Sequence, residues 1–130
     1  MNIENSKKIS QAAPSLFYNS ARDEAQEHPF YFECGDGWAD LLYDAAAQIN
    51  NHIKTLPPEV REEIIAYQVK EKFGTLRFYV SYYTPEIDEI LKVAVEKSCT
   101  TCETCGKEGK IRGSMWLYTA CDEHALKEDL

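Results

Sequence analysis

The chain has 130 residues, of which 44% are hydrophobic and 28% charged, and its formal net charge is −8. This length and composition are typical of one globular domain, and no apolar run approaches the ~18 residues that a membrane-spanning helix needs. The acidic balance argues against broad attraction to nucleic acid or to an anionic membrane, although a local basic patch can still bind either.

Residues 1–28 are predicted to form an N-terminal extension. They are polar with scattered apolar positions, which is compatible with one or two short helices or with a segment that wraps the core from outside. The first residues lack the apolar stretch of a signal peptide, so we expect the protein in the cytoplasm.

Residues 29–98 are predicted to form an α+β core that opens with a short strand and an amphipathic helix. The strand is expected at 30–32, directly after a proline. Asp36 is the expected N-cap of the helix, and Asp40 lies in the first turn, where an acid is favourable. The Leu56-Pro57-Pro58 run is expected to end the helix. Its apolar face, at helical spacing, comprises Trp38, Leu41, Leu42, Ala45, Ile49 and Ile53.

The segment 65–83 predicts a β-hairpin. A two-residue turn at Gly74-Thr75 gives a core face with the pairs Phe73–Leu76, Glu71–Phe78, Val69–Val80 and Tyr67–Tyr82. The other face then carries the pairs Lys72–Arg77, Lys70–Tyr79 and Gln68–Ser81. One register thus separates a core face from a basic, aromatic-bearing face. The second is a candidate binding face, which comprises Gln68, Lys70, Lys72, Arg77 and Tyr79.

Glu71 is the one charged residue on the expected core face. An acid in that position must be paired, hydrogen-bonded or placed at the edge of the sheet. It is either a buried charge at a functional site or a solvated residue close to the turn, and we favour the second interpretation.

A second helix is predicted after the hairpin. Thr84 followed by Pro85 is typical of an N-cap and the first helical position. An apolar stripe runs from there to Cys99 and comprises Ile87, Ile90, Leu91, Ala94 and Val95. Because no flexible linker follows, we expect residues 99–130 to form a small module packed on the core.

This last segment carries two pairs of metal-ligating residues, Cys102 with Cys105 and Cys121 with His124. The spacing within and between the pairs is typical of zinc sites. Gly106 allows a tight turn after the first pair, Gly113 marks a hairpin, and 121–130 reads as a short helix. Together these features predict a treble-clef-like zinc module. Four good ligands favour a closed structural site over a catalytic one, which keeps a position for water.

Other uses of the cysteines are less favoured. The cysteine count of five is odd, which argues against a disulfide framework. Cys99, Cys102 and Cys105 form two overlapping Cys-x-x-Cys pairs, but the βαβ pattern that precedes a thioredoxin-like redox site is missing. Cys99 can also replace a ligand; we expect a spare buried thiol, because Gly106 favours the pair Cys102 and Cys105.

Four stretches, GDGWADLLYDA, QVKEKFGTLRFYV, CETCG and CDEH, resemble a family of small uncharacterised bacterial and phage proteins. These proteins pair a motif similar to KEKFG-LRFY with a terminal zinc-binding module. The resemblance covers residues 30 to 126, and KEKFGTLRFY is its most specific part. It implies a bacterial host cytoplasm as the setting if a phage encodes the protein, and it implies no mechanism.

Two binding functions are compatible with these observations. We favour a non-catalytic protein-binding module, such as a phage- or prophage-encoded modulator or inhibitor of a host protein. The alternative is nucleic-acid binding, in which the candidate binding face contacts phosphates and stacks a base. Lys107, Lys110 and Arg112 can extend that patch, although few cations and an acidic chain oppose it.

An enzyme is the third hypothesis. Cys34 stands just before a helix start, which favours a thiolate, but Glu33 and Asp36 beside it raise the pKa of the thiol. We therefore expect an idle thiol. His28 and His52 have no partner that the sequence reveals.

Overall fold

The computed structural model describes residues 1–18 and 30–130, and it confirms the predicted α+β class. The helices are α1 (Ile3–Ala12), α2 (Pro14–Phe17), α3 (Ala39–Ile53), α4 (Pro58–Arg61) and α5 (Pro85–Ser98). The strands are β1 (Phe32–Glu33), β2 (Ala66–Lys72), β3 (Thr75–Val80), β4 (Lys110–Arg112) and β5 (Tyr118–Ala120). Within the described residues, short 3₁₀ helices lie at Asp36–Trp38 and Lys127–Asp129. No described helix is both long and apolar enough to cross a membrane.

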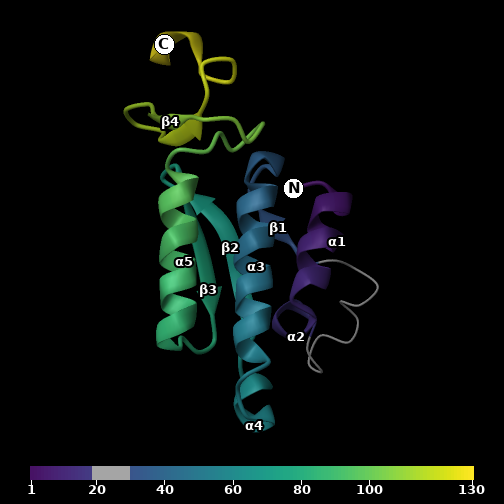
Figure 1. Cartoon of the computed structure of the whole chain (residues 1–130). Coiled ribbons are helices and arrows are strands. Elements are labelled where there is room, and N and C mark those ends of the chain that lie inside the picture. Colours follow the sequence, from purple (N-terminus) through teal and green to yellow (C-terminus); the bar gives the residue numbers. More distant parts are fainter. Residues whose placement is uncertain (19–29) are drawn as a thin grey trace.

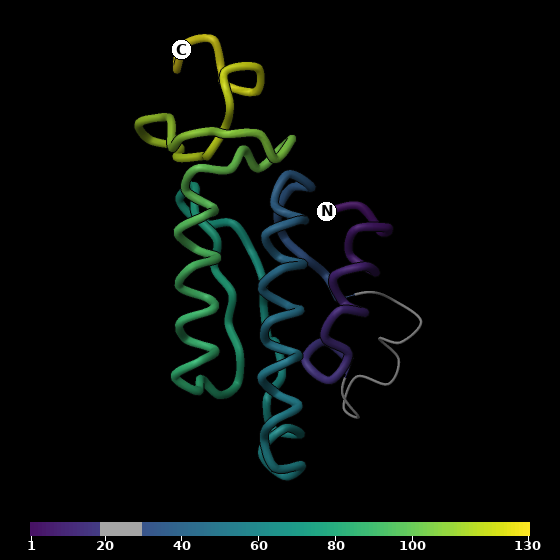
Figure 2. The backbone as a smooth tube through the Cα atoms, in the orientation of Figure 1, coloured from purple at the N-terminus to yellow at the C-terminus, as the bar shows by residue number. Residues whose placement is uncertain are grey.

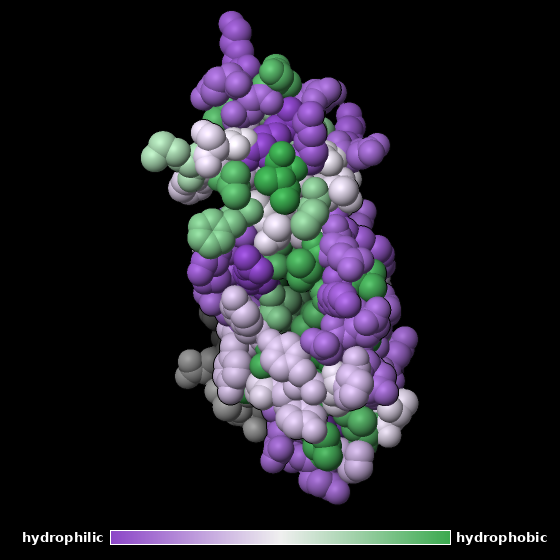
Figure 3. All heavy atoms as spheres, turned by 90° about the vertical axis from the view of Figure 1, so that its left-hand side faces the viewer, coloured by the Kyte–Doolittle hydropathy of each residue, from purple (hydrophilic) through white to green (hydrophobic). Residues whose placement is uncertain are grey.

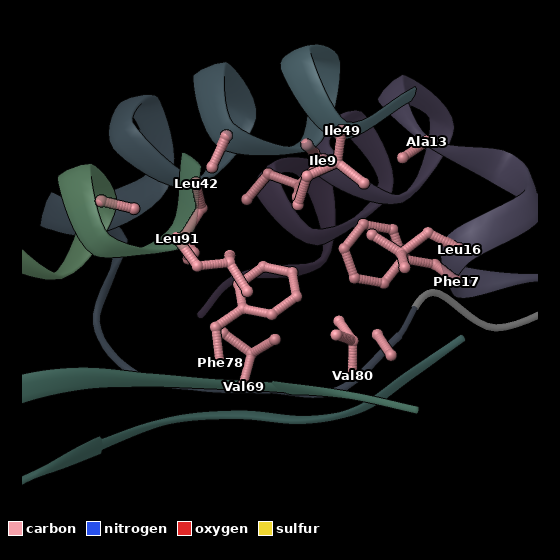
Figure 4. Packing of buried hydrophobic residues seen from close by; sticks show 14 of the residues in the cluster. Ile9, Ala13, Leu16, Phe17, Leu42, Ile49, Val69, Phe78, Val80 and Leu91 are labelled. Atoms are coloured by element: carbon pink, nitrogen blue, oxygen red, sulfur yellow. The ribbon is translucent and has the colours of Figure 1, made fainter. Parts of the chain in front are cut away.

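The core lies between a helical layer and a three-stranded sheet (Figure 1). Strand β1 pairs in parallel with β2, and β2 pairs antiparallel with β3. Side chains of the two layers point toward one another, with Leu42 and Leu91 facing Val69 and Phe78 (Figure 4). The β4–β5 hairpin and the C-terminus lie beyond one end of these layers (Figure 2). Residues 99–130, which carry the predicted ligands and are called the metal-binding segment below, therefore sit at the end of the core and not on its helical face (Figure 2).

The described part of the expected N-terminal extension contributes to the core. Residues 1–18 form the predicted short helices, and Ile9, Ala13, Leu16 and Phe17 are buried in the main cluster. The ring of Phe17 lies 5.3 Å from that of Phe32, between centroids. Helix α1 therefore packs beside α3 as part of the same layer (Figure 1). Residues 19–29, with His28, lie outside the described residues.

Helix α3 follows the predicted pattern, and all six residues of its expected apolar face are buried. The predicted cap is wrong. Asp36 begins the 3₁₀ helix, and its Oδ1 accepts hydrogen bonds from the backbone N–H of Asn2 at 2.8 Å and from Nδ2 of Asn5 at 3.1 Å. The bond from Asn2 lowers the pKa of Asp36. Asp36 thus anchors the start of α1, a contact that spans more than thirty positions.

The β2–β3 hairpin forms, but the predicted register is wrong by two residues. Lys72 faces Thr75, Lys70 faces Arg77 and Val69 faces Phe78, so the turn is Phe73-Gly74 and not Gly74-Thr75. Both turn residues have positive φ, 55° and 82°, which is the conformation of a type I′ turn. A shift of two keeps the side chains of 68–72 and 75–79 on their predicted faces, but a β-bulge between Ala66 and Gln68 changes the register beyond them. The predicted core residues at the ends, Tyr67, Phe73 and Tyr82, are nevertheless exposed.

Helix α5 begins as predicted. The Oγ1 of Thr84 accepts a hydrogen bond from the N–H of Ile87 at 3.1 Å, and Pro85 occupies the first turn. At the other end, fully buried Ser98 accepts a hydrogen bond from the N–H of Leu76 at 3.0 Å. This bond joins the end of α5 to β3 and so fixes where residues 99–130 start.

Candidate metal centre

The structure brings the four predicted ligands together. Their ligand atoms all lie within 4.8 Å of one another, and the side chains are those of Cys102, Cys105, Cys121 and His124. The two Sγ atoms of Cys105 and Cys121 are 3.7 Å apart. The Nδ1 atom of His124 lies 3.7 Å from Sγ of Cys102 and 3.3 Å from Sγ of Cys121.

These separations fit a tetrahedral metal ion. Zinc bonds of about 2.3 Å to sulfur and about 2.0 Å to nitrogen place neighbouring ligand atoms about 3.5–3.8 Å apart. The cluster can therefore hold a metal with Nδ1 of His124 as the nitrogen ligand. Three thiolates and one imidazole are the donors that zinc prefers. Four protein ligands complete a tetrahedron, which is the arrangement of a structural site.

The first cysteine pair lies on a tight turn. The N–H of Gly106 donates to the carbonyl of Cys102 at 2.9 Å, and Gly106 has a φ of 82°. Burial by itself raises the pKa of Cys102, but hydrogen bonds from the backbone of Cys121, Cys105 and Thr104 outweigh it and lower the pKa to about 6. The thiolate is the form that binds a metal.

The second pair lies on a hairpin and a turn. Strands β4 and β5 pair antiparallel around the Gly113 loop, as expected. The helix predicted for 121–130 is wrong, because a turn follows Cys121 and only the 3₁₀ helix at Lys127–Asp129 comes after it. The buried Arg112 explains the difference, since its guanidinium donates to Asp122 Oδ1 at 2.6 Å and to the carbonyl of Asp129 at 3.3 Å. The cysteine turn and the hairpin of the predicted treble-clef-like module are thus present, and its helix is not.

Hydrogen bonds attach the cysteine turn to the loop before α3. Glu103 accepts from the N–H of Gly35 through Oε2 and from the N–H of Gly37 through its carbonyl, both at 2.8 Å. The indole Nε1 of Trp38 donates to the carbonyl of Thr101 at 2.8 Å. Burial raises the pKa of Glu103. Sequence reasoning missed these contacts, because the loop and the cysteine turn are more than sixty positions apart.

Two glycines let backbones approach closely at this junction. A Cβ at Gly37 would lie 2.1 Å from the carbonyl oxygen of Cys102, so no side chain fits there. On the other side, the hydroxyl of Thr119 in β5 donates to the carbonyl of Gly74 at 2.5 Å. The β2–β3 turn therefore packs against β5. Both the loop before α3 and the hairpin turn thus contact the metal-binding segment.

The five residues of the candidate binding face share one face in the observed register too, but their cross-strand partners differ from the predicted ones. Lys70 faces Arg77, Gln68 faces Tyr79, and Lys72 faces Thr75, so the predicted pairs are wrong while the five side chains stay on one face. Gln68 donates from Nε2 to Glu33 Oε2 at 2.8 Å, which places a carboxylate on that face.

Two of the three cations expected to extend this face, Lys107 and Arg112, have acidic partners. Lys107 lies 3.7 Å from Glu123, and Arg112 lies 2.6 Å from Asp122, between nitrogen and oxygen. Within residues 1–18 and 30–130, by contrast, no ion pair involves Lys70, Lys72 or Arg77. Lys110 and most other described cations also lack an ion pair, so what distinguishes the hairpin is the grouping of Lys70, Lys72 and Arg77 on one face.

The residues considered for catalysis have structural partners. Glu71 accepts a hydrogen bond from the N–H of Gly74 at 2.8 Å, which agrees with the favoured position close to the turn. His52 has the partner that the sequence did not reveal, since its Nε2 lies 2.8 Å from Oγ1 of Thr84. Cys99 is half-buried, lies 3.4 Å from the carbonyl of Val95 and is not one of the clustered ligands.

Cys34 is expected to be an unreactive thiol in the native protein. Burial first, and then the charge of Glu103, raise its pKa from 9.0 to about 12. The folded state thus favours the neutral thiol, so this contribution to stability is present below pH 9.0 and is lost as the pH rises toward 12. At neutral pH the thiolate fraction falls about a thousandfold.

A metal-loaded Cys99→Ser variant tests the predicted low reactivity of Cys34, because Cys34 is then the one cysteine outside the metal cluster. The rate of modification by a thiol reagent, followed by mass spectrometry, should be about a thousandfold below that of the denatured chain. A native rate equal to the denatured rate contradicts the prediction.

The resemblance to small bacterial and phage proteins involves this end of the molecule. KEKFGTLRFY spans the end of β2, the turn and most of β3, and CETCG and CDEH carry the clustered ligands. The family itself stays a prediction. Comparisons of the chain with protein-family models, with curated proteins and with solved structures found no match.

Proposed function

We propose that this protein is a non-catalytic protein-binding module whose C-terminal segment is held by a structural zinc ion. Its role would be to bind a host protein and to modulate or inhibit it. The closed set of four ligands supports a structural metal, because no position remains for a reacting water molecule. The bacterial or phage setting rests on the resemblance alone.

One observation carries the protein-binding part of the proposal. The β4–β5 hairpin presents Met115 and Trp116 to solvent, with 100% and 78% of their surfaces exposed. Gly113 shapes this loop, since its φ is 93° and a Cβ there would lie 1.9 Å from the carbonyl oxygen of Trp116. Tryptophan is enriched among residues that dominate protein–protein affinity, and methionine adapts to varied partner surfaces.

Nucleic-acid binding is the second candidate, and the position of Lys70 opposite Arg77 favours it. Tyr79 is exposed beside them and offers a ring for stacking. Three unpaired cations release few counterions, however, and Glu33 lies on the same face. The chain also carries a net charge of −8. We therefore rank this function second.

Affinity capture from bacterial lysate tests the proposed function. Zinc-loaded protein is the bait, the lysate is treated with nuclease, and chelator-stripped protein is the control bait. We expect one protein to be retained in equimolar amount, to survive nuclease, and to be lost with the stripped bait. That protein, once purified, should form a complex in size-exclusion chromatography. Recovery of nuclease-sensitive material alone, or of nothing equimolar, would count against protein binding.

A further inference from the structure

An exposed apolar patch lies where the metal-binding segment meets the sheet. We call it the junction patch, and it comprises Phe73, Ile111, Met115 and Trp116. Ile111 pairs with Thr119, and Thr119 contacts Gly74 next to Phe73, so the two hairpins join here. In Figure 3, apolar side chains gather at this level, directly above a strongly hydrophilic group. Exposed apolar groups of this kind mark interaction sites.

The backbone conformation of Phe73 indicates that a phenylalanine does not stabilise the β2–β3 turn. Phe73 has a φ of 55°, a left-handed conformation that is unfavourable for a bulky residue, and 63% of its surface is exposed. Asparagine or glycine is favoured at this position of a type I′ turn. The phenylalanine thus adds strain and buries little apolar surface. Such strain is concentrated at binding and catalytic sites.

The junction patch adjoins unpaired positive charge. Lys72 precedes Phe73, and its Nζ lies 5.5 Å from the centre of the phenylalanine ring. Lys70 and Arg77 form the next cross-strand pair on this face, about 7 Å further along the strands. In the described ranges these three cations have no acidic partner. The local charge beside the patch is therefore positive, although the chain as a whole carries a net charge of −8.

We propose that the junction patch, with Lys70, Lys72 and Arg77, binds an acidic protein segment that carries aromatic or aliphatic side chains. This inference rests on the proposed function and names its partner by chemistry. Charge complementarity selects the acidic residues, and the exposed apolar side chains accept the apolar ones. Phe73 and Trp116 offer rings that can accept either an apolar side chain or a base, whereas Ile111 and Met115 suit an apolar side chain, which favours a peptide over a nucleic acid.

Selection from a displayed library of random dodecapeptides tests the proposal on the full, zinc-loaded chain. We expect the enriched peptides to combine Asp or Glu with Phe, Trp or Leu. Phe73→Asn should weaken their binding about tenfold or more. Its melting temperature should equal or exceed that of the wild type, because asparagine suits the turn. Loss of binding in this variant therefore does not reflect unfolding.

Charge reversal tests the cations. The Lys70→Glu/Lys72→Glu variant should weaken binding of the selected peptides about tenfold. Lys7→Glu/Lys92→Glu makes the same change in net charge on exposed helical positions and should leave binding unchanged. Tyr82→Ala removes an exposed ring beyond the far end of β3 and is the matched control for Phe73→Asn.

The outcomes separate the two proposals. Peptides without acidic enrichment, no enrichment at all, or equal binding by Phe73→Asn would overturn the inference. Tighter binding of oligothymidylate than of every selected peptide, lost in Lys70→Glu/Lys72→Glu, would assign the site to single-stranded nucleic acid instead. The captured host protein can be tested against Phe73→Asn and Lys70→Glu/Lys72→Glu. If it binds both as tightly as it binds the wild type, the proposed function stands and the assignment of the binding site to the junction patch is wrong. If the selected peptides bind the junction patch but no host protein is captured, the binding site stands and the proposed host-protein function does not.

Discussion

Replacing Cys102 with serine is expected to release the metal and to unfold residues 99–130. Cys102 is fully buried and lies 3.7 Å from Nδ1 of His124. Structural zinc contributes on the order of 10–16 kcal/mol of apparent binding free energy in small zinc domains. The segment has a buried cluster of its own of only three residues, with Tyr118 packed against them, so apolar burial alone cannot replace the metal.

Metal content by elemental analysis and amide hydrogen exchange check this result. In Cys102→Ser, residues 99–130 should lose protection, while α3 and β2 keep theirs. Cys99→Ser is the matched control, because Cys99 lies outside the cluster and should leave both the metal and the protection in place. A Cys102→Ser protein that is metal-free and fully protected would show that the site does not hold this segment together.

Replacing Trp38 with alanine is expected to lower the free energy of unfolding by about 3–5 kcal/mol. Trp38 is fully buried, and its Nε1 donates to the carbonyl of Thr101 at 2.8 Å. The change leaves a large cavity and removes a hydrogen bond between the core and the metal-binding segment. We expect weaker protection of residues 99–102 in hydrogen exchange as well.

The second tryptophan is the control. Trp116 is exposed, so Trp116→Ala should change stability by less than about 0.5 kcal/mol. Urea unfolding followed by far-ultraviolet circular dichroism measures both variants without relying on tryptophan emission. If Trp38→Ala does not fold, Trp38→Phe keeps a ring and removes only the donor, at a cost of about 1–3 kcal/mol. Equal stabilities for the Trp38 and Trp116 alanine variants would contradict this account of the core.

Local patterns predicted the helices well. The apolar face of α3 was predictable because helical spacing repeats within the helix itself. All six residues predicted for that face, the first being Trp38 and the last Ile53, are buried. The start of α5 was readable for the same reason, since Thr84 and Pro85 act within one turn. Asp36 shows where such reasoning fails. Its sequence position suits a cap for α3, but its partners belong to α1.

The hairpin was predictable in its faces and not in its register. Alternation has a period of two, so a shift by two residues leaves the same faces and cannot be detected from the pattern. The predicted turn, Gly74-Thr75, placed glycine first, whereas the observed turn places Phe73, a poor choice for a left-handed position, before Gly74. The packing of Gly74 against β5 is a tertiary contact that the sequence does not reveal.

The sequence by itself determined the set of candidate metal ligands, because cysteine and histidine chemistry and the spacing within each pair are local properties. Tertiary structure decided how the cluster is attached to the core, through Glu103, Gly37 and Trp38. It also decided that Phe73 lies beside the β4–β5 hairpin, next to unpaired cations. These contacts join segments far apart in the chain, and they depend on how whole layers pack rather than on any pattern within one segment.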